Sequence, residues 1–302
     1  MQERMSLGEV RSILKGTTDQ PSDEWNGIIR DATSNTVVIV AISRSSGGSE
    51  RIQQAGTGTL VFLDGAHYIL TATHVWDSIL VHADRLGATI RTGRGQPNTF
   101  SIDIRAMSAP IAFPREQGCE QWGPDLALLR IPDFCVGTIE AFRPFFDLHA
   151  ISKVVPRGND SIETWILCGV PAVLGTSSET AAHAHGRAFQ VEVESVHNRN
   201  GFDYIDVLAH WPSTSVAPHF GGVSGGGLWK LSLYVDPLAG RIDCIRTLEG
   251  VAFYQFPFRK EHSVLRCHGP NSLRLVSANC AERSCDLPPA FLPFITGDSL
   301  HC

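Results

Sequence analysis

Three short segments of the chain carry residue types that can do nucleophilic chemistry together. His74 ends the segment Tyr-Ile-Leu-Thr-Ala-Thr-His, Asp125 precedes an apolar run, and Ser224 lies among glycines. A serine hydroxyl is a weak nucleophile at neutral pH, so it needs a base, and histidine is the side chain that suits this role. The base needs an acid behind it, which fixes its tautomer and stabilises the imidazolium. We therefore expect His74 as general base, Asp125 as orienting acid and Ser224 as nucleophile.

Glycines surround this serine in the run Phe-Gly-Gly-Val-Ser-Gly-Gly-Gly of residues 220–227. They allow a sharp turn and expose backbone N–H groups, and those of Gly222 and Ser224 could hold a developing oxyanion. The run could also be a flexible turn or a phosphate cradle, but no Gly-Lys-Ser/Thr sequence follows it. Each segment alone is ambiguous, and Asp77 is a rival acid near His74. The order histidine, aspartate, serine makes the set specific.

Together these segments resemble the motifs of trypsin/chymotrypsin-like serine proteases, especially the bacterial and intracellular members without the vertebrate disulfides. The matching motifs are Thr-Ala-x-His, Asp-Leu-Ala-Leu-Leu and Gly-x-Ser-Gly-Gly, at residues 71–74, 125–129 and 222–226. Weaker likenesses are a Gly-x-Gly strand, a Gly-x-Pro turn and a cleft-lining strand, at residues 56–60, 169–171 and 250–254. The resemblance covers roughly residues 35–260. It implies two antiparallel six-stranded β-barrels with the catalytic residues in the cleft between them, and no cofactor.

Three positions depart from the family pattern. Val223 precedes the serine where digestive members have an aspartate that pairs with a newly cut N-terminus, so activation by that ion pair is not available. Val75 follows the histidine where many secreted members have a cysteine. Ala252 is aligned with the position from which the cleft strand often gives a hydroxyl to the catalytic acid. An active enzyme of this kind needs another restraint, such as a narrow pocket, a partner or an unformed oxyanion loop.

The resemblance also places the substrate pocket, which would be formed by Pro218, His219, Phe220, Phe253, Tyr254 and Gln255. No acid lies between Ala209 and Val235, so a lysine or arginine side chain would be buried without a counter-charge. We therefore expect an enzyme that does not cleave after Lys or Arg. His219 could donate to a Glu, Asp or Gln side chain of a substrate, or it could be a loop residue that faces solvent, and the sequence gives both readings equal weight.

The composition limits the class of protein. The chain has 302 residues, of which 43% are hydrophobic and 19% charged, so it can form a packed core. Lys plus Arg number 25 and Asp plus Glu 31, and the net charge of −6 argues against a nucleic-acid partner held by bulk charge. No apolar stretch is as long as a membrane span, and the N-terminus has no secretory signal. We expect a cytoplasmic protein with a protein or peptide substrate, and leave open a regulatory protein partner.

The cysteines and histidines give little sign of a metal site. Eight cysteines occur, and we interpret them as mostly unpaired thiols in a reducing compartment. Cys280 with Cys285, or His183 with His185, could be half of a metal site, but neither pair has a second half at zinc-finger spacing. We therefore expect no metal.

Hydrophobic periodicity predicts a mostly β chain that begins with helices. Apolar residues show helical spacing after Ser6 and again after Ser22, and a further helix is expected near residues 273–278. Asp64-Gly65 predicts a hairpin turn. Short runs rich in β-branched residues predict strands at residues 36–42, 57–63, 67–71, 88–91, 101–106, 126–131, 165–170, 188–196, 204–210, 227–233 and 250–255.

These features divide the chain into four parts. Residues 1–34 would form a helical N-terminal extension, and residues 35–143 would form a first barrel with His74 and Asp125. Residues 144–260 would form a second barrel with Ser224 and the oxyanion loop, and residues 261–302 would form a tail packed on the body. We favour a serine endopeptidase. The alternative is a catalytically silent binding or scaffolding protein, although such pseudo-enzymes usually lose a triad residue or the glycines. An α/β-hydrolase esterase orders its triad serine, acid, histidine, and so fits less well.

Overall fold

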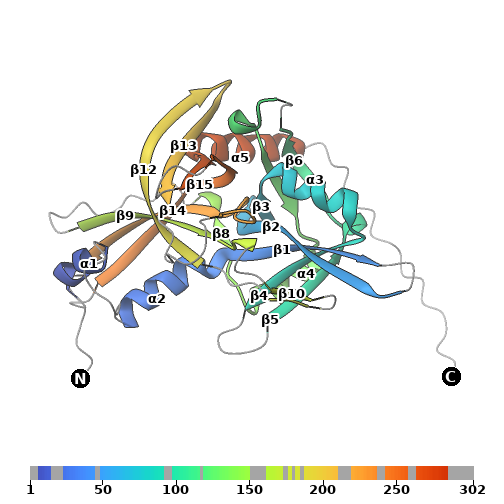
Figure 1. Cartoon of the computed structure of the whole chain (residues 1–302), viewed down its shortest axis with the longest axis horizontal. Helices are drawn as coiled ribbons and strands as arrows, with labels where there is room; N and C mark the ends of the chain where they lie inside the picture. The colour runs from blue at the N-terminus through green and yellow to red at the C-terminus, as the bar shows by residue number, and fades with distance from the viewer. Residues whose placement is uncertain are drawn as a thin grey trace.

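The computed structural model describes residues 6–14, 23–44, 48–91, 97–115, 118–149, 161–172, 176–178, 181–183, 187–209, 219–236, 242–257 and 263–284. Most of the described residues lie in β-strands, and these strands form two large sheets (Figure 1). The predicted all-β class is therefore confirmed.

The N-terminal sheet has eight strands, in the spatial order β5-β4-β1-β2-β3-β7-β6 with β8 parallel to β2. The strands are β1 (Thr36–Arg44), β2 (Glu50–Leu63), β3 (Ala66–Thr71), β4 (Arg85–Arg91), β5 (Pro97–Asp103), β6 (Ser108–Phe113), β7 (Leu126–Arg130) and β8 (Phe146–Asp147). This sheet curls but does not close within the described residues, because β5 and β6 stay at its edges. The described residues therefore form a curled sheet here, and the expected closed barrel of six strands is not confirmed by them.

The turn between β2 and β3 forms where the sequence predicts it. Asp64 and Gly65 have φ angles of 48° and 80°. Positive φ at both central residues suits a two-residue hairpin, because the twist of such a turn matches that of its strands.

The C-terminal sheet is a closed barrel in the order β12-β13-β16-β15-β14-β9. Its strands are β9 (Ser161–Gly169), β12 (Arg187–Arg199), β13 (Phe202–Ala209), β14 (Gly227–Val235), β15 (Ile242–Gln255) and β16 (Ser263–His268), and a separate pair is formed by β10 (Thr176–Ser178) and β11 (Ala181–His183).

One boundary of the barrel needs a correction. The sequence pattern ends the second barrel at residue 260 and assigns residues 261–302 to a tail. In the structure β16 pairs with both β13 and β15, and all its residues are buried, so it is an integral strand of the barrel. Three of those buried residues are Ser263, Arg266 and His268. Because they are polar, hydrophobic periodicity does not predict a strand here.

The helices lie around the two sheets (Figure 1). They are α1 (Leu7–Leu14), α2 (Asp23–Ala32), α3 (Thr73–His82), α4 (Asp133–Glu140) and α5 (Pro270–Ser284), with 3₁₀ turns at η1 (Thr33–Asn35), η2 (Ile104–Ala106) and η3 (Glu120–Trp122). α1 and α2 lie in the expected extension, where Val10 and Trp25 pack with Leu233 and Ile242 of the barrel. α5 is longer than expected, while α3 and α4 were not predicted. No helix in the described ranges is long and apolar enough to cross a membrane.

The two sheets share a hydrophobic core. One buried cluster joins Leu70 and Leu128 of the N-terminal sheet to Ile166 and Trp229 of the barrel, and Leu273 of α5 belongs to the same cluster. Because the sheets pack directly on each other, the ends of β3 and β7 are fixed relative to the loop before β14.

Candidate active site

His74 stands just after β3, in the first turn of α3. Thr73, the first residue of that helix, donates through Oγ1 to a backbone carbonyl at the end of β6 at 2.8 Å. β3 and β7 are antiparallel, with Thr71 opposite Ala127. The end of β3 therefore lies beside the start of β7, which Asp125 immediately precedes. Strand register thus brings together two residues that are far apart in the sequence.

Asp125 faces His74 with both carboxylate oxygens. The His74 backbone N–H donates to Asp125 Oδ1 at 2.9 Å, and His74 Nδ1 lies 2.7 Å from Asp125 Oδ2. The Asp125 side chain is 0% exposed and that of His74 is 32% exposed. Burial acts to raise the pKa of Asp125, but the hydrogen bonds from His74 and the charges of His74 and Arg115 outweigh it, so the pKa lies below its usual value. The buried acid is therefore ionised at neutral pH.

The rival acid, Asp77, does not take this place. It is exposed on α3, and in the described part of the chain no hydrogen bond joins it to His74. Partial burial and then the charge of Asp125 raise its pKa. Asp125 is the carboxylate in contact with the imidazole.

The loop that carries Ser224 is tied to β2. Thr57 N–H donates to Ser224 O at 2.9 Å, and Thr57 Oγ1 donates to Gly222 O at 2.7 Å. Gly222 and Gly225 have φ angles of 92° and 90°, a backbone conformation that favours glycine. A Cβ on Gly225 would also collide with the backbone of Thr57. The glycines noted in the sequence are therefore needed for the close approach of this loop to the sheet.

Two backbone N–H groups of this loop are available to a ligand. The Gly221 carbonyl accepts a hydrogen bond from Ala172 N–H at 2.7 Å. Because a trans peptide is planar, Gly222 N–H points away from Ala172. Across the described residues, no hydrogen bond uses Gly222 N–H or Ser224 N–H. These are the two donors that the sequence suggests for an oxyanion.

Ser224 and His74 lie in neighbouring segments but are not hydrogen-bonded. A Cβ added to Gly56 would lie 2.7 Å from a methyl carbon of Val75 and 3.1 Å from Ser224 O, so one glycine separates the helix of the histidine from the loop of the serine. Within the described chain, no hydrogen bond joins Ser224 Oγ to His74. The structure therefore pairs His74 with Asp125 and places Ser224 nearby.

Arg115 and His268 also contact this site, and the sequence analysis did not find them. Arg115 Nε donates to Asp125 Oδ2 at 2.9 Å, and Nη2 lies 3.1 Å from His74 Nδ1. His268 Nε2 accepts a hydrogen bond from Asp125 N–H at 3.1 Å, and its ring stacks on Phe253 at 4.4 Å. Burial lowers the pKa of His268 to about 4, so the ring is neutral and can accept. Both contacts join distant segments, and no local motif marks them.

The residues expected in the substrate pocket are not all exposed. Pro218 lies outside the described residues. His219 is exposed, and its Nδ1 accepts a hydrogen bond from Gly221 N–H at 2.9 Å. Phe220 and Phe253 are only 2% and 1% exposed, so they offer little surface to a substrate.

The other two pocket residues, Tyr254 and Gln255, are partly exposed at the end of β15. Gln255 Oε1 accepts from Phe220 N–H at 3.1 Å and so links this strand to the loop of the serine.

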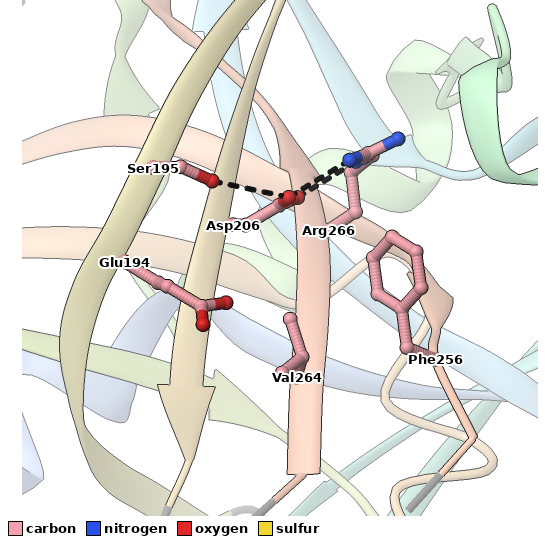
Figure 2. Close-up of a pocket in the computed structure, with 6 residues that line it drawn as sticks. All are labelled: Glu194, Ser195, Asp206, Phe256, Val264 and Arg266. Carbon is pink, nitrogen blue, oxygen red and sulfur yellow. Dashed lines mark hydrogen bonds and ion pairs between the residues drawn. The ribbon is translucent and has the colours of Figure 1, made fainter. Parts of the chain in front are cut away.

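A second group of serine, histidine and aspartate lies on the closed barrel, and its Ser195 and Asp206 line a cavity of about 350 Å³. Figure 2 shows these two residues with the others that line the cavity. Ser195 Oγ is 2.9 Å from His197 Nε2, and the same nitrogen is 3.2 Å from Asp206 Oδ2. A triad needs the acid and the serine on opposite ring nitrogens, so this group lacks that arrangement. Arg266 holds the Asp206 carboxylate with two hydrogen bonds of 2.7 and 2.8 Å. The cavity is lined by Glu194, Ser195, Asp206, Phe256, Val264 and Arg266.

This second group braces the loop that leads to Asp125. The Arg266 guanidinium lies 3.9 Å from the ring centre of Trp122, and Arg266 Nη1 donates to Gln121 O at 2.8 Å. Tyr204 OH donates to Trp122 O at 2.5 Å. Strands β13 and β16 of the closed barrel therefore position the aspartate that precedes a strand of the other sheet.

Comparison with known proteins adds little to these observations. The sequence matches no protein-family model and no curated protein. A similar solved structure comes from work on aromatic interactions in the coupled folding and binding of the intrinsically disordered Sesbania mosaic virus VPg protein. It is 15% identical, with 77% of this chain and 85% of that chain covered, and its TM-score is 0.36. A likeness this weak carries no argument about fold or function.

Proposed function

We propose that this chain is a serine endopeptidase of the trypsin/chymotrypsin-like kind, in which Ser224 is the nucleophile, His74 the general base and Asp125 the orienting acid. The observation that carries the proposal is the contact of 2.7 Å between His74 Nδ1 and the buried carboxylate of Asp125. This pairing leaves His74 Nε2 as the proton acceptor on a partly exposed ring. In this proposal the curled sheet corresponds to the first barrel of the family and the closed barrel to the second.

The reaction would follow the chemistry of an acyl-enzyme. Ser224 Oγ attacks the carbonyl carbon of a peptide bond while His74 Nε2 takes the hydroxyl proton. The tetrahedral intermediate collapses when His74 returns that proton to the leaving amine, which leaves an ester on Ser224. Water then attacks the ester by the same steps and releases the acid product. The unbonded N–H groups of Gly222 and Ser224 support this proposal, because donors aimed at the oxyanion lower the barrier.

We further propose that the enzyme does not cleave after Lys or Arg. His219 is exposed beside the serine loop and brings no negative charge, and the described residues of that loop include no acid. A cation buried without a carboxylate would lose its water without gaining a counter-charge.

A cleavage profile with a peptide library tests activity and preference together. Wild type and Ser224→Ala, purified side by side, are expected to differ in that only wild type cuts, and no cut should follow Lys or Arg. Equal cleavage by both proteins would contradict the assignment of Ser224 as the nucleophile. Cleavage after basic residues would contradict the proposed substrate pocket but not the assignment of Ser224 as the nucleophile.

A binding or scaffolding role on the same fold is the second candidate. It is favoured by the missing hydrogen bond between Ser224 and His74. If neither protein cuts any peptide or reacts with a serine-directed reagent, this second candidate is the one that stands.

A further inference from the structure

Arg115 touches both side chains of the proposed base and acid, and neither a motif nor the resemblance gives it a role. Its Nε donates to Asp125 Oδ2 at 2.9 Å, and its Nη2 lies 2.7 Å from the same oxygen. Nη2 is also 3.1 Å from His74 Nδ1 and 3.5 Å from Phe253 O. Its side chain is 29% exposed, and in the described part of the chain it makes no other hydrogen bond or ion pair. Arg115 is thus held only by the site itself.

The short distance between His74 and Asp125 places the proton of the neutral imidazole. Nδ1 lies 2.7 Å from an ionised carboxylate oxygen, where a lone pair would face a negative charge. The proton therefore sits on Nδ1 and is donated to Asp125. An Nδ1 that already carries hydrogen cannot accept from Arg115. Arg115 and His74 are two donors that share one oxygen, and the 3.1 Å contact between them joins a cation to an N–H group.

This arrangement suits the resting site better than the transition state. When Ser224 attacks, His74 becomes an imidazolium that Asp125 must stabilise. With Arg115 in place, the carboxylate is already paired, and a second positive charge stands beside the ring. Like charges at this distance repel each other appreciably in a partly buried site. An interaction that is more favourable in the ground state than in the transition state lowers the rate.

We propose that Arg115 is an inhibitory positioning residue, which holds the Asp125 carboxylate in place at rest and slows the reaction until its guanidinium moves away. This inference rests on the proposed function. It supplies a restraint for a chain whose Val223 rules out control by an N-terminal ion pair. Partial exposure and the lack of other partners allow Arg115 to leave the site.

Two substitutions separate the charge of Arg115 from its shape. Arg115→Gln keeps side-chain N–H donors but removes the charge, and Arg115→Lys keeps the charge. The measurement is the second-order rate constant for labelling of Ser224 by a fluorophosphonate. We expect Arg115→Gln to react about tenfold faster than wild type, the change produced by a barrier ~1.4 kcal/mol lower. Arg115→Lys should stay near the wild-type rate. A slower Arg115→Gln, or equal acceleration by both substitutions, overturns the inference.

Proton NMR gives a second measurement, the chemical shift of the His74 Nδ1 proton. This shift should not change if Arg115 has only a structural role. The Nδ1–H of His74 should resonate far downfield, and further downfield in Arg115→Gln, because Asp125 Oδ2 is no longer paired with a second cationic donor. The control is Arg105→Gln, since Arg105 is 90% exposed and pairs with Asp103 away from the site. An unchanged resonance in Arg115→Gln overturns the inference.

The Ser224→Ala variant keeps the two proposals distinct. If wild type and Arg115→Gln both stay unlabelled, or if labelling survives Ser224→Ala, the proposed function fails. The NMR comparison then still decides whether Arg115 competes with His74 for the carboxylate.

Discussion

At the scale of single residues, Asp125 determines which nitrogen of His74 carries the proton. An amide in its place can turn its NH₂ group toward Nδ1, and Nε2 would then keep the proton and could not act as a base. We expect Asp125→Asn to lower kcat by about 10³–10⁴-fold with little change in KM. Steady-state kinetics on a library-derived peptide measures this, with Asp77→Asn as the control on the neighbouring exposed acid. Equal losses in the two variants would show that Asp125 has no special role.

His268, which accepts from the backbone of Asp125, makes stability depend on pH. Its pKa is lowered from 6.5 to about 4 by burial. As pH falls below 6.5 the unfolded chain takes up a proton that the folded chain refuses until about pH 4, so stability falls through this window. The loss amounts to roughly 3 kcal/mol at ~1.4 kcal/mol per unit. Urea unfolding across this range should show it. His268→Gln should flatten the trend and exposed His82→Gln should not; a steep trend in His268→Gln would contradict the assignment.

At the scale of elements, β2 sets the conformation of the serine loop through one hydroxyl. Thr57 Oγ1 donates to Gly222 O at 2.7 Å and accepts from Val170 N–H at 3.0 Å. Thr57→Val keeps the shape of the side chain but removes the hydroxyl that bonds the Gly222 carbonyl and the Val170 N–H. We expect this to lower the free energy of unfolding by about 1–3 kcal/mol. We expect kcat to fall about tenfold, because the oxyanion donors lose their fixed orientation. Thr57→Ser, which restores the hydroxyl, should recover both quantities. A normal kcat in Thr57→Val would mean that the loop orders itself.

Local sequence patterns predict most of the strands and the three segments of the site. They do not predict β16 or the role of Arg115, which depend on buried polar residues and on contacts between distant segments. Most of the expected strands were found because β-branched residues repeat within them, and the segments of His74, Asp125 and Ser224 stand out through short motifs. β16 was missed because polar side chains occupy its buried positions. Arg115 was missed because its partners come from the start of α3, the residue before β7 and β15, and no spacing in the sequence encodes such a meeting.

At the scale of the whole molecule, the described cysteines are present as thiols. No disulfide joins the six described cysteines, which include Cys168, Cys244 and Cys267. Burial raises the pKa of Cys168 and of Cys244 to about 12, so their reactive thiolate forms are suppressed. Thiol titration of the native protein should therefore find Cys119 reacting ahead of Cys168 and Cys244, because the raised pKa values of those two thiols leave little thiolate. Denatured, unreduced protein should reveal most of the eight as free thiols. Four disulfide bridges would overturn this interpretation.

The proposed mechanism depends on one chemical event, the reaction of Ser224 with an electrophile in the folded protein. The most direct measurement is intact-mass spectrometry after exposure to a fluorophosphonate, followed by peptide mapping of the modified residue. We expect a single adduct on Ser224 of the native chain, with none on urea-unfolded protein or on Ser224→Ala. An adduct on Ser195, or a native chain that stays unmodified in both wild type and Arg115→Gln, would contradict it.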